Sequence, residues 1–192
     1  MKNLFINLLI KLGLLKIDQT KYFDMLVKLH KDLPEMMLKN KNLNNEEHNN
    51  ALCEIKIFLW IIASPIFEEN VPFELFDKTM KFYRSNIIFS TIDEHQYSEE
   101  YISNLLIARL DFHQNGIQGK GFSSITDNYF QQLKVVLFEQ PFIDITELSK
   151  KNKYNLDIFN KVKGQAEGQL LYKHIVPGYV ESLKKLIKMT KK

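Results

Sequence analysis

Two arginines are the side chains of this sequence with the clearest capacity for chemistry. Arg84 and Arg109 are the only arginines among 26 basic residues, and a guanidinium fork can hold a carboxylate through two parallel hydrogen bonds. Asp111 and His113 follow Arg109 closely and complete a cluster of four. One interpretation places all four in a common polar pocket. The favoured one pairs the arginines internally with acids from the middle of the chain, because many charged networks are structural.

A glycine-rich stretch is the second candidate, within a loop predicted at 114–124. Residues 116–124 hold three of the seven glycines, and backbone N–H groups there could converge with a lysine on a phosphate-like anion. The candidate anion site comprises Gly119, Lys120, Gly121 and Ser123. The spacing does not fit a P-loop, and a predicted helix precedes the stretch, so a connecting loop is favoured. A small-anion binder or enzyme that combines this loop with Arg84 and Arg109 stays as an alternative.

Metal and catalytic motifs are absent from the sequence. The five histidines stand in separate segments, without H-E-x-x-H or a di-iron type E-x-x-H pair. The only cysteine, Cys53, falls in an apolar helix, where a thiol is a poor nucleophile. We therefore predict no metal site and no cofactor, and we favour a non-enzyme.

The element that must position everything else is a helix predicted at 51–67. Residues 57–63 are apolar at every position, so this helix has no solvent face there and must be wrapped by others. It is too short and too interrupted by Glu54, Lys56 and Pro65 to span a bilayer. The most polar stretch, 38–50, precedes it and predicts a solvated loop whose last residues open the helix.

The rest of the chain has the pattern of amphipathic helices. Glycine and proline are scarce, with seven and five residues respectively, which favours helices over turn-rich β structure. With 192 residues, one well-buried core is expected. We predict an all-α, single-domain bundle, residues 1–192, of about seven to nine helices around helix 51–67.

The first helix, predicted at 2–17, carries a wide apolar face. The residues that share this face at helical spacing are Leu4, Phe5, Leu8, Leu9, Leu12 and Leu15, while Asn3, Asn7 and Lys11 form a narrow polar stripe. One interpretation is an anchor on a membrane surface, or a helix in a partner's groove. The favoured one is a core helix packed along residues 51–67, because membrane-surface helices usually have a strongly charged polar face.

Charge is unevenly distributed along the chain. Residues 1–45, 46–140 and 141–192 carry net charges of +4, −7 and +6, which makes the total of +3. The acids of the middle region could meet a basic partner: Glu46, Glu47, Glu68, Glu69, Asp93, Glu94, Glu99 and Glu100. The scarcity of arginine counts against a nucleic-acid partner.

These observations favour a non-enzymatic protein that binds another protein. Bacterial adaptors, inhibitors and immunity-type proteins are of this kind, and the bias toward Lys, Asn and Ile suits an AT-rich bacterial gene. A single cysteine cannot form an internal disulfide, so a reducing cytoplasm is the expected location. The alternative is a peripheral membrane protein anchored by residues 2–17.

Overall fold

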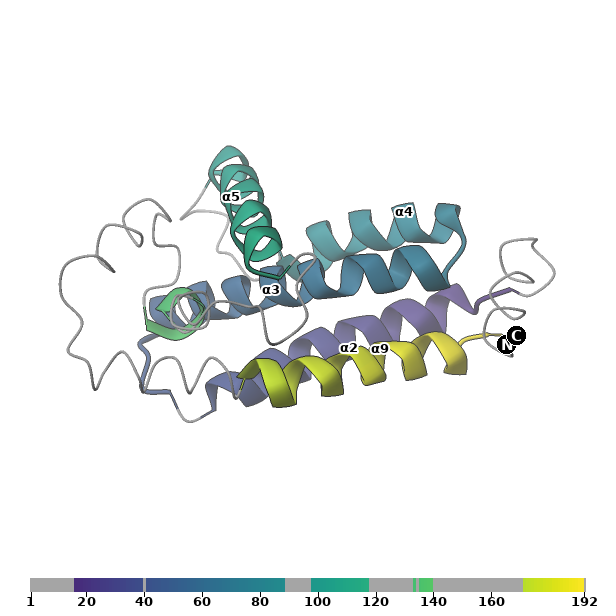
Figure 1. Ribbon diagram of the computed structural model, residues 1–192, viewed down its shortest axis with the longest axis horizontal. Coiled ribbons are helices and arrows are strands. Elements are labelled where there is room, and N and C mark those ends of the chain that lie inside the picture. The colour runs from purple at the N-terminus through teal and green to yellow at the C-terminus, as the bar shows by residue number, and fades with distance from the viewer. Residues whose placement is uncertain are drawn as a thin grey trace.

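The computed structural model describes residues 16–39, 41–88, 98–117, 133, 135–139 and 171–191 (Figure 1). Helix dominates these residues, and among them only Ile17 and Lys191 form a β-bridge. The predicted all-α class is confirmed. Eight helical elements are distinguished here, and because η1 continues α4 and α9 continues η5, they form six helical segments. The described part of the chain thus holds fewer helices than the seven to nine predicted.

Helix α3, Asn45–Asn70, is the longest element and lies at the centre (Figure 1). It begins six residues before the predicted start, because Asn44 and Glu47 form a capping box: Asn44 Oδ1 accepts from Glu47 N at 2.9 Å and Glu47 Oε2 accepts from Asn44 N at 3.0 Å. Much of the stretch 38–50 is therefore helix rather than loop. Pro65 lies inside α3, and the helix continues past the predicted end at residue 67 to Asn70.

Helix α2, Gln19–Leu38, is capped by Asp18, whose side chain accepts from Lys21 N at 3.2 Å. A proline inside a helix usually ends or kinks it, and Pro34 lies in α2. Instead the helix continues to Leu38, and both Pro34 and Leu38 are buried. Their burial offsets the backbone hydrogen bond that a proline removes.

Helix α9, Val176–Met189, continues a π-helical segment, η5 at Leu171–Ile175. Its last residues meet the start of α2, where Asp18 N donates to Thr190 O at 2.7 Å. Farther along, His30 of α2 meets Tyr179 of α9. The two helices are therefore antiparallel and lie side by side (Figure 1).

Helix α4, Phe73–Phe82, follows Pro72 and passes into the π-helical segment η1, Tyr83–Ile88. The buried stripe of this pair consists of Leu75, Thr79 and Tyr83, each four residues after the last. Phe73, although aromatic, is 81% exposed. Its place at the first helical position turns it away from α3.

Helix α5, Glu99–Ile117, crosses the first half of α3. At the start of α5, Ser98 Oγ accepts a hydrogen bond from Tyr101 N at 3.1 Å. A short π-helical segment, η4 at Val135–Glu139, also contacts α3. The predicted loop 114–124 overlaps the end of α5, and its residues 118–124 lie outside the described residues.

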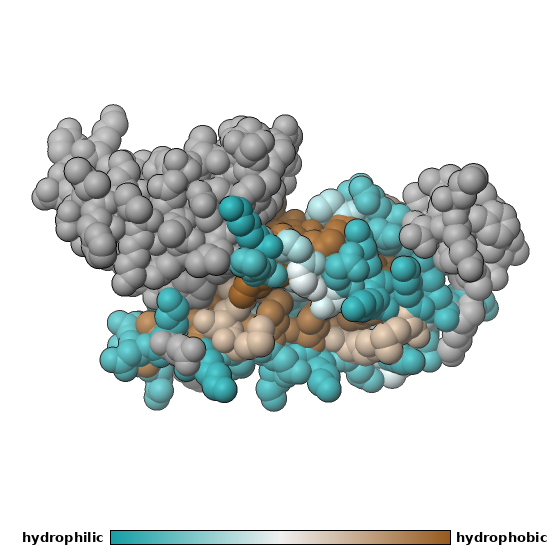
Figure 2. All heavy atoms as spheres, turned by 60° about the horizontal axis from the view of Figure 1, so that its bottom comes forward, coloured by the Kyte–Doolittle hydropathy of each residue, from teal (hydrophilic) through white to brown (hydrophobic). Residues whose placement is uncertain are grey.

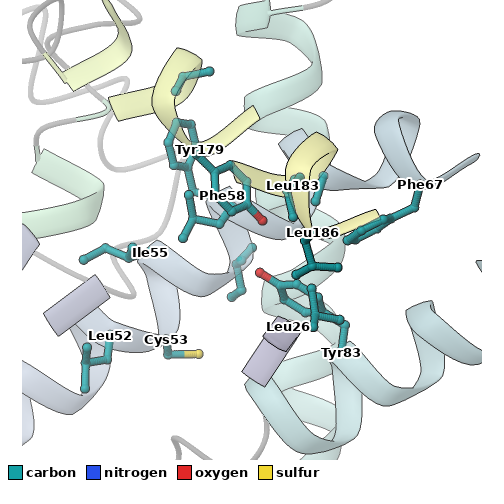
Figure 3. Packing of buried hydrophobic residues seen from close by; sticks show 14 of the residues in the cluster. Leu26, Leu52, Cys53, Ile55, Phe58, Phe67, Tyr83, Tyr179, Leu183 and Leu186 are labelled. Atoms are coloured by element: carbon teal, nitrogen blue, oxygen red, sulfur yellow. The ribbon is translucent and has the colours of Figure 1, made fainter. Parts of the chain in front are cut away.

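The core forms where α2, α3, η1 and α9 meet, and Figure 3 shows their side chains converging. Ten residues of α3 are buried, and each neighbouring helix adds a stripe to them. This arrangement confirms that the apolar run of α3 is enclosed on most of its sides.

Candidate functional site

One side of α3 is open over the second half of the helix. Glu54, Phe58, Ile61 and Pro65 recur at the spacing of a single helix face. Helix α5 covers Glu54 and Phe58. Arg109 of α5 donates hydrogen bonds to Glu54, and the ring centroids of His113 and Phe58 lie 5.1 Å apart. Beyond α5 the same face is exposed at Pro65.

This open face is the floor of a cavity of about 550 Å³. The floor consists of half-buried isoleucines and an exposed proline of α3: Ile61, Ile62, Pro65 and Ile66. Val176, Val180 and Lys184 of α9 form one wall, and Leu110 and His113 of α5 close one end. We call this cavity the α3 groove.

Charges lie at the far end of the α3 groove. Glu68 and Glu69 of α3 are exposed on its rim, and exposed Lys184 of α9 also lines it. On the face seen in Figure 2, hydrophilic side chains project from the described helices and apolar ones lie in bands between them. The groove thus combines an apolar floor with a charged mouth, which suits an amphipathic occupant.

Arg109 forms a buried ion pair rather than part of an open pocket. Its Nη2 donates to Glu54 Oε1 at 2.6 Å and its Nε donates to Glu54 Oε2 at 2.9 Å. Both side chains are at most 1% exposed. The pair joins α5 to α3, as expected for an arginine that pairs internally.

The four residues of the predicted polar pocket do not line one cavity, although Arg109 and His113 lie one turn apart on the buried face of α5. Arg84 lines a second cavity, of about 350 Å³, where its Nη2 donates to Ser103 Oγ at 2.9 Å. His113 lines the α3 groove, Asp111 is exposed, and Arg109 borders neither cavity. No common site for an anion results from these four.

Two buried histidines are held neutral. Burial lowers the pKa of His30 to about 4, although the hydrogen bond of Nδ1 to Leu26 O opposes that shift. Burial also lowers the pKa of His113 to about 3, and the positive charge of Arg109 adds to the effect. Neither histidine is charged at neutral pH.

Cys53 is fully buried, and burial raises the pKa of its thiol far above the ordinary range. A thiol in this state is a poor nucleophile. Within the described residues, no three His, Cys, Asp or Glu side chains gather as metal ligands would.

Those acids of the predicted surface whose side chains the structure describes do not lie in one patch. Glu46 and Glu47 lie at the first turn of α3 and Glu68 and Glu69 at its last, about 33 Å apart by helix rise. Glu100 is exposed on α5. The side chain of Glu99 is not described, and Asp93, Glu94 and the candidate anion loop of Gly119, Lys120, Gly121 and Ser123 lie outside the described residues.

Sequence reasoning missed the α3 groove and the partner of Arg109. Glu54 was the available signal for the ion pair, because a carboxylate in the buried part of a helix requires a cation beside it. The signal for the groove was the exposed end of the same helix: Glu68 and Glu69 continue the face of Ile61 and Pro65.

By length and composition, α3 is also the one helix in the described part of the chain that could cross a membrane. Its most apolar window has a mean hydropathy of 1.5, and 56% of that window is buried inside the protein. A buried core helix meets the same criterion, so this finding has little weight.

Comparisons with known proteins add no relative. No family model matches the chain, and neither a curated protein nor a solved structure does so. The argument for function therefore depends on the geometry of the described residues.

Proposed function

We propose that this protein is a non-enzymatic interaction module, an adaptor, inhibitor or immunity-type protein, that binds an amphipathic helix of another protein. The observation that carries the proposal is the α3 groove, an apolar floor open to solvent between α9 and α5. Amphipathic helices bind in grooves of this kind through an apolar stripe. Its volume of about 550 Å³ is within the usual range of binding sites, about 300–1,000 Å³.

The chemistry of the rim specifies the partner further. Glu68 and Glu69 would attract lysine or arginine on the polar side of a bound helix, and Lys184 would face an acid across the groove. Of the acids first assigned to a partner surface, these two glutamates therefore have the strongest support. The rest of that surface remains a prediction from the sequence.

The two alternatives keep the support that the sequence gives them. A membrane anchor would use residues 2–17, which lie almost wholly outside the described residues. A small-anion site would depend on Arg84 in its cavity with Ser103, since Arg109 is already neutralised by Glu54. The protein-binding function has the larger site and the clearer chemical match.

Affinity capture with groove variants tests the proposal. The full chain, Pro65→Glu, Ile66→Glu and the double variant Glu68→Lys/Glu69→Lys are compared for the proteins they retain from the native cell. We expect one stoichiometric protein whose capture is lost in all three variants, because a charge on the floor or a reversed rim repels the bound helix. Thermal unfolding confirms that each variant is folded.

Glu74→Lys is the matched control, since Glu74 is exposed on α4 away from the groove. It reverses the same charge and should leave capture unchanged. Equal capture by the full chain and the folded Pro65→Glu variant would contradict the proposed function.

A further inference from the structure

The second cavity, of about 350 Å³, is formed by two elements that both pack on α3 (Figure 1). Met80, Lys81 and Arg84 line it from a single face of α4 and its continuation η1. The α5 residues that line it also share a helix face: Ser103, Leu106, Ile107 and Leu110. Trp60 is the residue that α3 contributes. We call this cavity the Arg84 cavity.

The side chains inside the Arg84 cavity are mostly apolar. Leu106 is only 7% exposed, and Trp60 Nε1 donates to the sulfur of Met80 at 3.2 Å. This hydrogen bond holds the indole ring of α3 against α4, beside the cavity. A cavity of this size with an apolar lining and a few polar groups is typical of a small-molecule site.

Positive charge lies at the rim of the Arg84 cavity. Lys81 and Arg84 are exposed, and the described residues that line the cavity include no acid. Arg84 Nη2 donates to Ser103 Oγ at 2.9 Å, so the guanidinium connects η1 to α5 at the cavity. Lys81 Nζ lies 2.8 Å from Asp77 Oδ2, which offsets part of the lysine charge. The remaining charge at this rim favours an anion.

We propose that the Arg84 cavity binds a small amphipathic carboxylate, a molecule with an apolar chain or ring and one carboxylate group. The apolar part lies against Trp60 and Leu106, and the carboxylate meets the planar guanidinium of Arg84, whose geometry matches two carboxylate oxygens. The proposal goes beyond the proposed function, since this ligand is not the partner helix and its site is not the α3 groove.

Titration of the full chain with decanoate tests the proposal. Trp60 is the only tryptophan, so its fluorescence reports on the cavity that it lines, and calorimetry measures the same binding. Decyltrimethylammonium has the same apolar chain with the opposite charge, and both compounds are used below the concentration at which they form micelles. We expect saturable binding of decanoate and an affinity for decyltrimethylammonium that is about tenfold lower or less.

Substitutions at the rim identify the cavity that is occupied. Trp60 and Leu110 line both cavities, so the fluorescence change alone does not distinguish them. Arg84→Gln should lower the affinity for decanoate about tenfold, because it removes a charge-assisted hydrogen bond. Lys184→Gln is the matched control, since it removes the same charge from the α3 groove, and it should leave the affinity unchanged.

A pair of opposite charges at Ile107 gives a second test. Ile107 lines the Arg84 cavity and is 61% exposed, so both variants should fold, which circular dichroism checks. Ile107→Glu should weaken the binding of decanoate by repelling the carboxylate, whereas Ile107→Lys should keep or strengthen it.

Three results would overturn the proposal. The first is the absence of saturable decanoate binding by the folded full chain. The second is equal affinity for decanoate and decyltrimethylammonium, because binding would then reflect apolar contact alone. The third is weaker binding with Lys184→Gln but not with Arg84→Gln, which would place decanoate in the α3 groove. None of these results depends on partner capture, so this proposal and the proposed function fail independently.

Discussion

At the scale of single residues, the ion pair between Glu54 and Arg109 sets the position of α5. Both groups are withdrawn from water and held by hydrogen bonds of 2.6–2.9 Å. A buried pair gains little over apolar packing, but losing one partner leaves a charge without compensation. Its contribution is therefore to fix which face of α5 meets α3.

We expect Glu54→Gln to lower the free energy of unfolding by about 3–5 kcal/mol, because Arg109 then stays buried without its carboxylate. The double variant Glu54→Leu/Arg109→Met should recover most of this loss. Urea denaturation of Glu54→Leu, Arg109→Met and this double variant measures the coupling between the two side chains. If the losses of unfolding free energy in the two single variants add up to the loss in the double variant, the two side chains act independently.

His30 links the stability of the protein to pH. Its Nδ1–H donates to Leu26 O at 2.8 Å, and its Nε2 accepts from the hydroxyl of Tyr179 at 2.5 Å. This arrangement uses the neutral ring, which agrees with a pKa of about 4 in the folded protein. The unfolded chain, with an ordinary pKa of 6.5, binds the proton first.

The contribution of His30 to the free energy of unfolding is therefore fully present above pH 6.5. It decreases by about 1.4 kcal/mol per pH unit as the pH falls toward 4. His113, with a folded pKa of about 3, contributes in the same window and with the same sign. We expect His30→Gln to remove about half of the combined slope. Urea midpoints measured from pH 7 to pH 4 test this, with exposed His174→Gln as the control that should keep the full slope.

At the scale of elements, local signals at helix starts were more informative than prolines. Asn44 with Glu47, Asp18 and Ser98 each cap the helix that follows them. Pro34 and Pro65, by contrast, lie inside α2 and α3. Packing of the residues beyond each proline, such as Leu38 and Phe67, stabilises the helix past a break that sequence alone predicts.

We expect Asn44→Ala to lower the free energy of unfolding by about 1 kcal/mol, because it removes the acceptor for Glu47 N. The change should appear as a lower urea midpoint with an unchanged slope. Asn42→Ala is the control, since Asn42 is exposed in the connection before the cap. Equal midpoints for the two variants would show that the capping box adds nothing.

At the scale of the whole molecule, the sequence predicted the helical class and the central helix but not the candidate site. The apolar run at 57–63 was sufficient to place α3 inside the bundle. The inner face of α5 was harder to predict, because two of its buried residues, Arg109 and His113, are polar and were counted as site residues. Cavities arise from what neighbouring helices leave uncovered, and the pattern of a single helix does not contain that information.

The antiparallel pairing of α2 and α9 also determines how the fold would yield under mechanical force. Asp18 and Thr190 are bonded at one end of the pair, and His30 and Tyr179 meet farther along. A force applied between residues 17 and 191 therefore acts first on the hydrogen bond between Asp18 and Thr190. It then separates α2 from α9 one helical turn at a time. A fold anchored in this geometry opens at low force, because its contacts break one after another rather than together.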